Sequence, residues 1–250
     1  FGHVIQELKL NNNEEFDTDF VLSKSNILKL GNGNLIESKK IEKRERIDLS
    51  DKNSYLFKSW NSENSPMLPM IQIDRGKDKS TKLWIHTNNH AERVDLNSKK
   101  YLEFFSNGFE SLPLLNDWQN YLSESLNNDS RFKLGEKTEA ISLCLNLNSD
   151  NEITEWSFHL TLVKCSQIVG SDHTDALLSR KSKTRITSRL LKPIKEHIDD
   201  LDKILEISES FRNKQLLEGK VEIPAPLNKI DTLNEFFIHN PGEYSRGYFE

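Results

Sequence analysis

AISLCLNLNSDNEITEWSFHLTLVK, residues 140–164, is the stretch from which the architecture of this chain can be read. Apolar and polar residues alternate in both of its halves, and the turn-forming sequence Ser-Asp-Asn-Glu separates them. The apolar sets are Ile141, Leu143, Leu145 and Leu147, then Trp156, Phe158, Leu160 and Leu162. Period-two alternation is typical of half-buried strands. The stretch therefore predicts an antiparallel hairpin of two strands, Ala140–Asn148 and Ile153–Lys164.

A long helix is predicted after this hairpin. Pro193 suits a first helical turn, and apolar residues follow at helical spacing: Ile194, Ile198, Leu201, Leu205 and Phe211. Gly219 is expected to end the helix, with Pro224 and Pro226 beyond it.

Strand and helix patterns alternate from Met70 onward, which predicts an α+β fold with a mixed, mostly antiparallel sheet and packed helices. Residues 1–51 are interpreted as a strand-containing lead segment, with a hairpin turn at Gly31–Asn34 and a charged linker after it. Residues 52–250 are interpreted as the main domain.

Bulk composition narrows the class of protein. At 250 residues and 29.0 kDa the chain can bury a core, and no apolar run of about 18 residues is available for a membrane span. The net charge of -5 argues against general nucleic-acid binding. Cys144 and Cys165 predict reduced, buried thiols and a cytoplasmic location. No signal peptide is visible. Because the chain starts at Phe1 instead of methionine and stops abruptly after EYSRGYFE, we expect a fragment of a longer protein.

The order of these elements resembles the RNB domain of the ribonuclease II and ribonuclease R family. The resemblance rests on the hairpin LCLNLNSDNEITEWSFHLTLVK and on the helix with Leu201, Phe211, Arg212 and Gly219. Upstream, KLWIHTNNHAERVDLNSKKYLEFF, RIDLSDKNSYLF and GHVIQEL are similar to further segments of the family. The resemblance implies an RNB-like fold for 52–250 and degradation of RNA from its 3′ end.

The resemblance also implies that hydrolysis in this family uses a cluster of aspartates, spaced as Asp, five residues, Asp, one residue, Asp-Asp. Several carboxylates must converge because magnesium prefers oxygen ligands and phosphodiester hydrolysis uses metal ions to hold the reacting oxygens. If Asp74 is the first aspartate, the other positions fall on Ser80, Lys82 and Leu83.

This placement from Asp74 is one register of the aspartate spacing on the sequence. A second register treats MIQID as the strand that follows the aspartate cluster and RGKDKST as the turn before KLWIHT. It is preferred because it leaves a hairpin of sensible length. The four positions then fall near Trp60, Pro66, Leu68 and Pro69, and Asn89 takes the place of a further family aspartate. In both registers the carboxylates are absent, so we predict no catalytic residues, no metal site and no cofactor.

Two basic clusters are candidates for RNA contact. Glutamates interrupt the cluster at Lys39–Arg46, which favours a solvated linker. The other has no acidic residue and contains Arg180, Lys181, Lys183, Arg185, Arg189 and Lys192. Clustered Lys and Arg bind phosphates by releasing counterions. An exposed solvated face is the alternative interpretation, but we take these six residues as the RNA-binding candidates.

Other conspicuous residues are interpreted structurally. His86 and His90 are expected to be surface histidines, since a four-residue offset on a strand does not pair two ligands. Asp199, Asp200 and Asp202 are expected to form an exposed ion-paired helix face with Lys195 and Lys203. The aromatic residues Trp84, Tyr101, Phe104, Phe105 and Phe109 could stack on bases but are more often core.

Three functions are therefore open. The preferred one is an RNB-like domain that binds single-stranded RNA and has lost hydrolysis. The alternatives are an active magnesium-dependent 3′-to-5′ exoribonuclease with a misaligned motif, and a structural or scaffolding domain. No membrane partner is expected, and the oligomeric state is left open.

Overall fold

The computed structural model describes residues 43–58, 67–76, 80–98, 101, 112–113, 118–119, 124–180, 188–221, 227–232 and 235–239. These residues divide into two compact units. Described residues of the smaller unit are 43–44 and those between 89 and 131. The larger unit holds 45–58, 67–76, 80–88 and the described residues from Phe132 onward.

Short elements make up the described part of the smaller unit: η2 (Ala91–Arg93), β5 (Leu112–Pro113), β6 (Trp118–Gln119) and α3 (Glu124–Ser130). The larger unit begins with β1 (Ile47–Asp48), β2 (Ser54–Lys58), β3 (Met70–Arg75) and β4 (Thr81–Asn88). It continues with β7 (Lys137–Leu147), β8 (Ile153–Gly170), α4 (Ser171–Leu178), η3 (Lys195–His197) and α5 (Ile198–Leu217). The strands β9 (Leu227–Thr232) and β10 (Glu235–His239) form an antiparallel hairpin.

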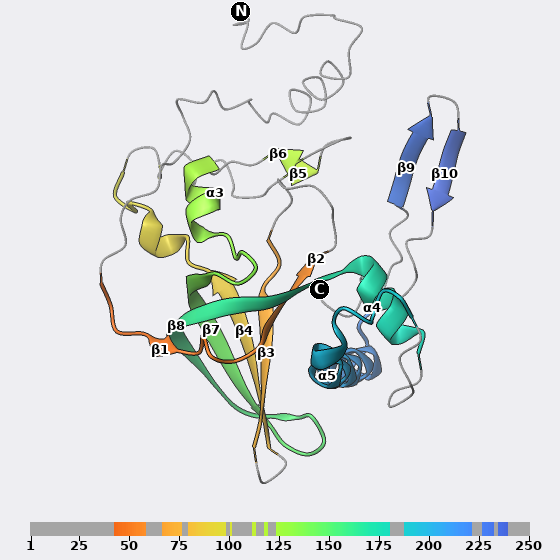
Figure 1. Ribbon diagram of the computed structural model, residues 1–250, viewed down its shortest axis with the longest axis horizontal. Helices are drawn as coiled ribbons and strands as arrows, with labels where there is room; N and C mark the ends of the chain where they lie inside the picture. Colours follow the sequence, from red (N-terminus) through yellow and green to blue (C-terminus); the bar gives the residue numbers. More distant parts are fainter. Residues whose placement is uncertain are drawn as a thin grey trace, which may run out of the picture. The chain divides into compact units, whose positions relative to one another are not determined.

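The main sheet has the strand order β1-β8-β2-β3-β4-β7, and β8 also pairs with β7. Because β8 pairs with both β2 and β7, these strands form a closed ring (Figure 1). β8 runs parallel to β1 and β2, whereas the other pairs of the main sheet are antiparallel. The predicted α+β class with a mixed, mostly antiparallel sheet is confirmed.

The predicted hairpins are present. β7 and β8 pair in the register Leu143↔Phe158 and Leu145↔Trp156, and Asn151 takes the left-handed conformation in the turn. β8 extends to Gly170, six residues beyond the predicted end at Lys164. β3 and β4 also form a hairpin, whose turn is closed by Gly76 N–H donating to Ser80 C=O at 2.8 Å.

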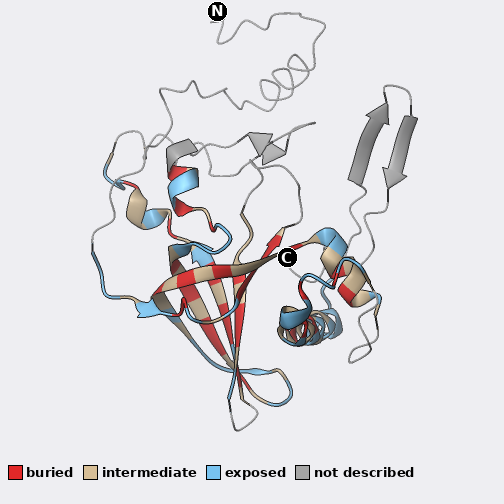
Figure 2. Ribbon diagram, in the orientation of Figure 1, coloured by how far each residue is buried: buried red, intermediate tan, exposed pale blue. Residues whose placement is uncertain are grey.

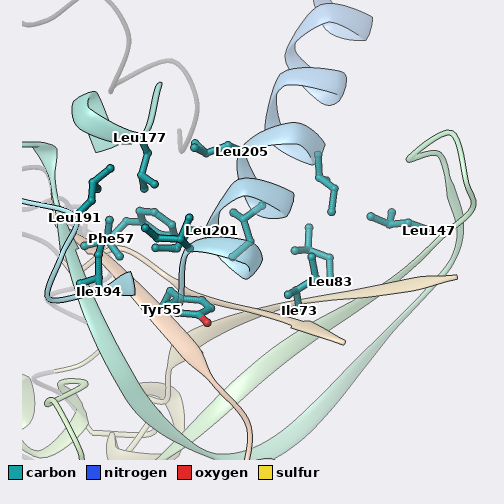
Figure 3. Close-up of a cluster of buried hydrophobic side chains, with 14 of the residues drawn as sticks. Tyr55, Phe57, Ile73, Leu83, Leu147, Leu177, Leu191, Ile194, Leu201 and Leu205 are labelled. Atoms are coloured by element: carbon teal, nitrogen blue, oxygen red, sulfur yellow. The ribbon is translucent and has the colours of Figure 1, made fainter. Parts of the chain in front are cut away.

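Two apolar clusters lie on opposite faces of the ring strands. The outer cluster joins the outward-facing side chains of the strands to α4, α5 and the segment before η3 (Figure 3). Its buried members include Tyr55, Phe57, Ile73, Leu83, Leu145, Leu147, Leu191, Ile194, Leu201 and Ile204. The inner cluster faces the inside of the ring and contains Leu49, Leu56, Met70, Trp84, Phe132, Ala140, Cys144, Val163 and Cys165. Buried residues alternate with others along β7, and along β8 from Thr161 to Cys165 (Figure 2).

α5 begins at Ile198, later than Pro193 suggests. Pro193 instead lies in the turn before η3, although Ile194 is buried in the outer cluster as its spacing predicts. Gly219 ends the helix with φ +97, and Lys220 N–H donates to Gln215 C=O at 2.9 Å. Such a left-handed residue satisfies the last carbonyls of a helix and favours glycine.

Parts of the sequence interpretation lie outside the described residues. Gly31–Asn34 and GHVIQEL are among them, so the lead segment 1–51 stays a prediction. Across the described residues, no helix combines the length and apolar character needed to cross a membrane.

Candidate functional site

Three of the six candidate RNA-binding residues have a described position. Lys181, Lys183 and Arg185 lie outside the described residues. Arg189 and Lys192 are exposed in the segment between α4 and η3, with the buried Leu191 between them. Leu191 packs into the outer cluster, so the core holds this segment while the two basic side chains point toward solvent.

Arg180 differs from them. Only 12% of its side chain is exposed, and its guanidinium forms an ion pair with Asp202 of α5. Arg180 therefore connects the residues that follow α4 to the long helix. A phosphate that contacted it would compete with the Asp202 carboxylate.

Asp200 and Asp202 at the start of α5 are ion-paired, but with Arg75 and Arg180 and not with the expected lysines. Asp200 accepts hydrogen bonds from Arg75 at 3.1 Å and from the Tyr55 hydroxyl at 2.9 Å. Lys203 pairs with Glu206 instead of an aspartate. Burial and the hydrogen bond to Asp200 raise the pKa of Tyr55 above its ordinary value. Because Arg75 and Tyr55 lie on β3 and β2, these contacts hold the start of α5 on the sheet.

Asp74, the first aspartate of one register, is bonded to a lysine and to an indole. Its carboxylate forms a 2.6 Å ion pair with Lys52 and accepts a hydrogen bond from the Trp84 indole at 3.3 Å. It lies in β3 directly opposite Lys82. A cation would have to displace Lys52 and would remain next to a second lysine.

In the preferred register, two of the expected aspartate positions fall just before β3. MIQID and KLWIHT form the β3–β4 hairpin that this register requires, so Leu68 and Pro69 immediately precede the strand. Trp60 and Pro66 lie outside the described residues. Within the described ranges, no three His, Cys, Asp or Glu side chains are grouped so that they could hold a metal ion.

Asn89, which stands where the family resemblance expects an aspartate, is fully buried. Its amide nitrogen donates a hydrogen bond to Glu92, whose carboxylate also pairs with Arg44 at 3.3 Å. An aspartate at this position would bring two carboxylates together, whereas the neutral amide can donate. The local contacts therefore suit asparagine.

The interpretation of His86 as a surface histidine is wrong. His86 is fully buried inside the ring, where its Nδ1 lies 2.7 Å from the Ser142 hydroxyl. Ser142 in turn lies 2.6 Å from the Thr161 hydroxyl. Burial lowers the pKa of His86 to about 4, although the nearby Asp74 carboxylate opposes the shift. This histidine is a neutral member of a buried hydrogen-bond chain.

The aromatic residues also separate into core and surface. Trp84 is buried in the inner cluster, as expected, and Tyr101 is half-buried, while Phe104, Phe105 and Phe109 lie outside the described residues. Sequence reasoning missed the exposure of Trp156 and Phe158, which are 62% and 65% exposed. Their alternation predicts a strand but does not reveal whether anything covers that face.

Both cysteines are free and buried in the inner cluster, as predicted. Burial raises the pKa of the Cys165 thiol to about 11 and also raises that of Cys144.

Comparisons with known proteins agree on one family. The RNB domain model matches residues 46–243. RNase R of Mycoplasma genitalium in complex with ribose-methylated single-stranded RNA superposes with a TM-score of 0.64 at 15% identity, covering 90% of this chain and 34% of RNase R. Yeast Ssd1, described as a pseudonuclease, gives a TM-score of 0.65 at 14% identity, covering 93% and 29%.

An active-site mutant of the Dss1 exoribonuclease from Candida glabrata gives 0.64 at 15% identity, covering 96% of this chain and 34% of Dss1. The chain thus spans about a third of the length of these structures. A search of curated protein sequences found no significant match.

Proposed function

Because the chain belongs to the RNB family, we propose that it binds single-stranded RNA and has lost the ability to hydrolyse it. The observation that carries this proposal is the start of β3. In the preferred register, two of the positions expected for aspartates fall near Leu68 and Pro69, and neither side chain can bind a cation.

The described residues do not fit the magnesium ion that hydrolysis would need. Asp74 is held by Lys52, and Asn89 donates to Glu92 instead of offering a carboxylate. The hydrolysis that the family resemblance implies uses metal ions to hold the attacking and leaving oxygens, so the contacts of Asp74 and Asn89 support a domain without catalysis.

RNA contact is assigned to the basic segment between α4 and η3. Arg189 and Lys192 are exposed there, and Lys181, Lys183 and Arg185 belong to the same run of sequence. RNase R is known in complexes with single-stranded and with double-stranded RNA, which supports an RNA partner for a chain with this fold. The buried, unpaired Cys144 and Cys165 support a cytoplasmic location.

Fluorescence anisotropy with a labelled single-stranded RNA at low salt tests binding. The double variant R189A/K192A should weaken binding about tenfold, and the slope of log affinity against log salt should fall by about 0.7 for each lost phosphate contact. K214A/K220A removes the same charge near the end of α5 and should leave affinity unchanged. Absence of binding by the native chain at low salt would contradict the proposal.

Incubation of 3′- and 5′-labelled RNA with magnesium or manganese tests the loss of hydrolysis. We expect the RNA to keep its full length on a denaturing gel. Metal-dependent shortening that a chelator abolishes would instead establish the active exoribonuclease. R189A/K192A serves as the control for contamination, because shortening by the chain itself should weaken with RNA binding.

A further inference from the structure

The first half of β8 has an edge to which no described strand is paired. Ile153–Leu160 pairs with β7 on one side, whereas β1 pairs only with Thr161 and Leu162, and β2 pairs only from Cys165 onward. Trp156 and Phe158 lie in this half, with their ring centroids 5.7 Å apart and the rings nearly perpendicular. An unpaired edge with large exposed apolar side chains is a site for pairing with another chain.

The direction of the free backbone groups follows from one hydrogen bond. Leu49 N–H donates to Leu162 C=O at 2.9 Å, so the backbone groups of Leu162 point toward the β1 side of β8. Backbone groups alternate in direction along a strand, and the β7–β8 register is regular over this stretch. The N–H and C=O groups of Phe158 and Trp156 therefore also face the free edge.

We propose that this edge binds the same edge of a second copy of the chain, as an antiparallel β8–β8 pair centred on Ser157. The sequence Glu-Trp-Ser-Phe-His, residues 155–159, is self-complementary about its centre. A twofold axis at Ser157 places Trp156 opposite Phe158 of the other copy, and the backbone groups of both residues point the right way to bond.

Side-chain chemistry supports the same register. The paired Trp156 and Phe158 rings lie on the outer face of both copies, where cross-strand aromatic pairs stabilise a sheet. On the opposite face, the Glu155 carboxylate meets His159 of the second copy. Asp150, Glu152 and Glu155 surround this end of the hairpin, so phosphates would be repelled and nucleic acid is a poor occupant.

Sedimentation velocity over a range of protein concentrations tests the pairing. We expect a monomer–dimer equilibrium in the native chain. F158K should raise the dimer dissociation constant about tenfold or more, since it removes both cross-strand aromatic pairs and places two lysines near the twofold axis, where lysine on an edge strand opposes pairing. L217K is the matched control, because Leu217 is an 89% exposed apolar residue at the end of α5. A native chain that is monomeric throughout, or F158K that dimerises like L217K, overturns the proposal.

Cysteine cross-linking tests the register. At the twofold axis the two Ser157 positions form a non-hydrogen-bonded pair with Cα atoms about 4.5 Å apart, which a disulfide can span. Because the free Cys144 lies opposite Ser157 in the β7–β8 register and could capture the new thiol within one chain, both cysteine variants are made in a C144A background. In that background S157C should form a disulfide-linked dimer under mild oxidation. T154C lies on the same exposed strand, but its two copies would be about 20 Å apart and should stay unlinked. Cross-linking of T154C but not of S157C overturns this register.

Thermal unfolding distinguishes a second possible occupant of the edge. If the native chain is monomeric and F158K lowers its melting temperature, the edge is instead covered by a segment of the same chain.

Discussion

The outer and inner clusters share the same strands but differ in their polar content. Above the strands, the outer cluster is built from apolar side chains together with the Tyr55 ring. Inside the ring, the inner cluster is accompanied by fully buried polar residues. These polar residues are Ser54, Gln72, His86, Ser142 and Thr161.

The difference follows from what covers each face. α5 offers a stripe of apolar side chains, and a strand residue that faces it must also be apolar. Inside the ring, side chains from neighbouring strands face one another, so a polar residue can be buried if a neighbour bonds to it. Ser54 donates to Gln72 at 3.1 Å, and His86, Ser142 and Thr161 form a chain across three strands. Burial therefore does not require an apolar sequence on the inner side.

The largest expected effect is a cavity in the outer cluster. Leu201 is 1% exposed, and L201A should lower the free energy of unfolding by about 3 to 4 kcal/mol because the lost contacts leave an empty space. Urea unfolding measures the change. L217A removes the same atoms from an exposed position and should change stability by less than about 0.5 kcal/mol. A small effect of L201A would mean that α5 contributes little to the core.

Lowering the pH should reduce the free energy of unfolding through His86, which lies on the inner side of the ring. His86 is neutral when folded and has a pKa of about 4, below the ordinary 6.5, so the unfolded chain takes up its proton first as pH falls. The stability due to this difference is complete above about pH 6.5 and is lost between pH 6.5 and 4. The loss should reach about 3 kcal/mol.

Urea unfolding of the native chain and of H86Q across this pH range isolates the contribution of His86. The native chain should lose more stability than H86Q as pH falls, while L201A should keep the native pH dependence. An equal pH dependence in the native chain and H86Q would place the proton uptake on other groups.

The strands could be predicted because alternation is a local property. The alternation in residues 140–164 predicted both strands of the β7–β8 hairpin, and Gly219 predicted the end of α5. Closure of the sheet could not be predicted, since it depends on β2 and β8 pairing across more than 100 residues of sequence. His86 was misinterpreted for this reason: polar positions of a strand face solvent in an open sheet but the interior in a closed ring.

The candidate site shows a similar limit. The run of basic residues from Arg180 to Lys192 could be found in the sequence, but the contact that separates Arg180 from Arg189 and Lys192 could not. Its partner Asp202 lies on α5, and only the packing of α5 beside α4 brings the two together. The exposure of Trp156 and Phe158 depends in the same way on where α5 lies.

Substitution of Arg180 should cause the smallest of these stability losses. It tests whether the outer side of the ring also depends on polar contacts. R180A should lower the free energy of unfolding by about 2 kcal/mol, because it leaves Asp202 partly buried without its cation. K203A breaks the more exposed pair with Glu206 and should cost at most about 0.5 kcal/mol. Each variant removes one positive charge. Measuring RNA affinity and urea unfolding for both variants therefore distinguishes an effect of charge from an effect on the structure. Weaker RNA binding by R180A at unchanged stability would return Arg180 to the RNA-contacting residues. A stability loss with RNA affinity equal to that of K203A would show that Arg180 holds α4 to α5.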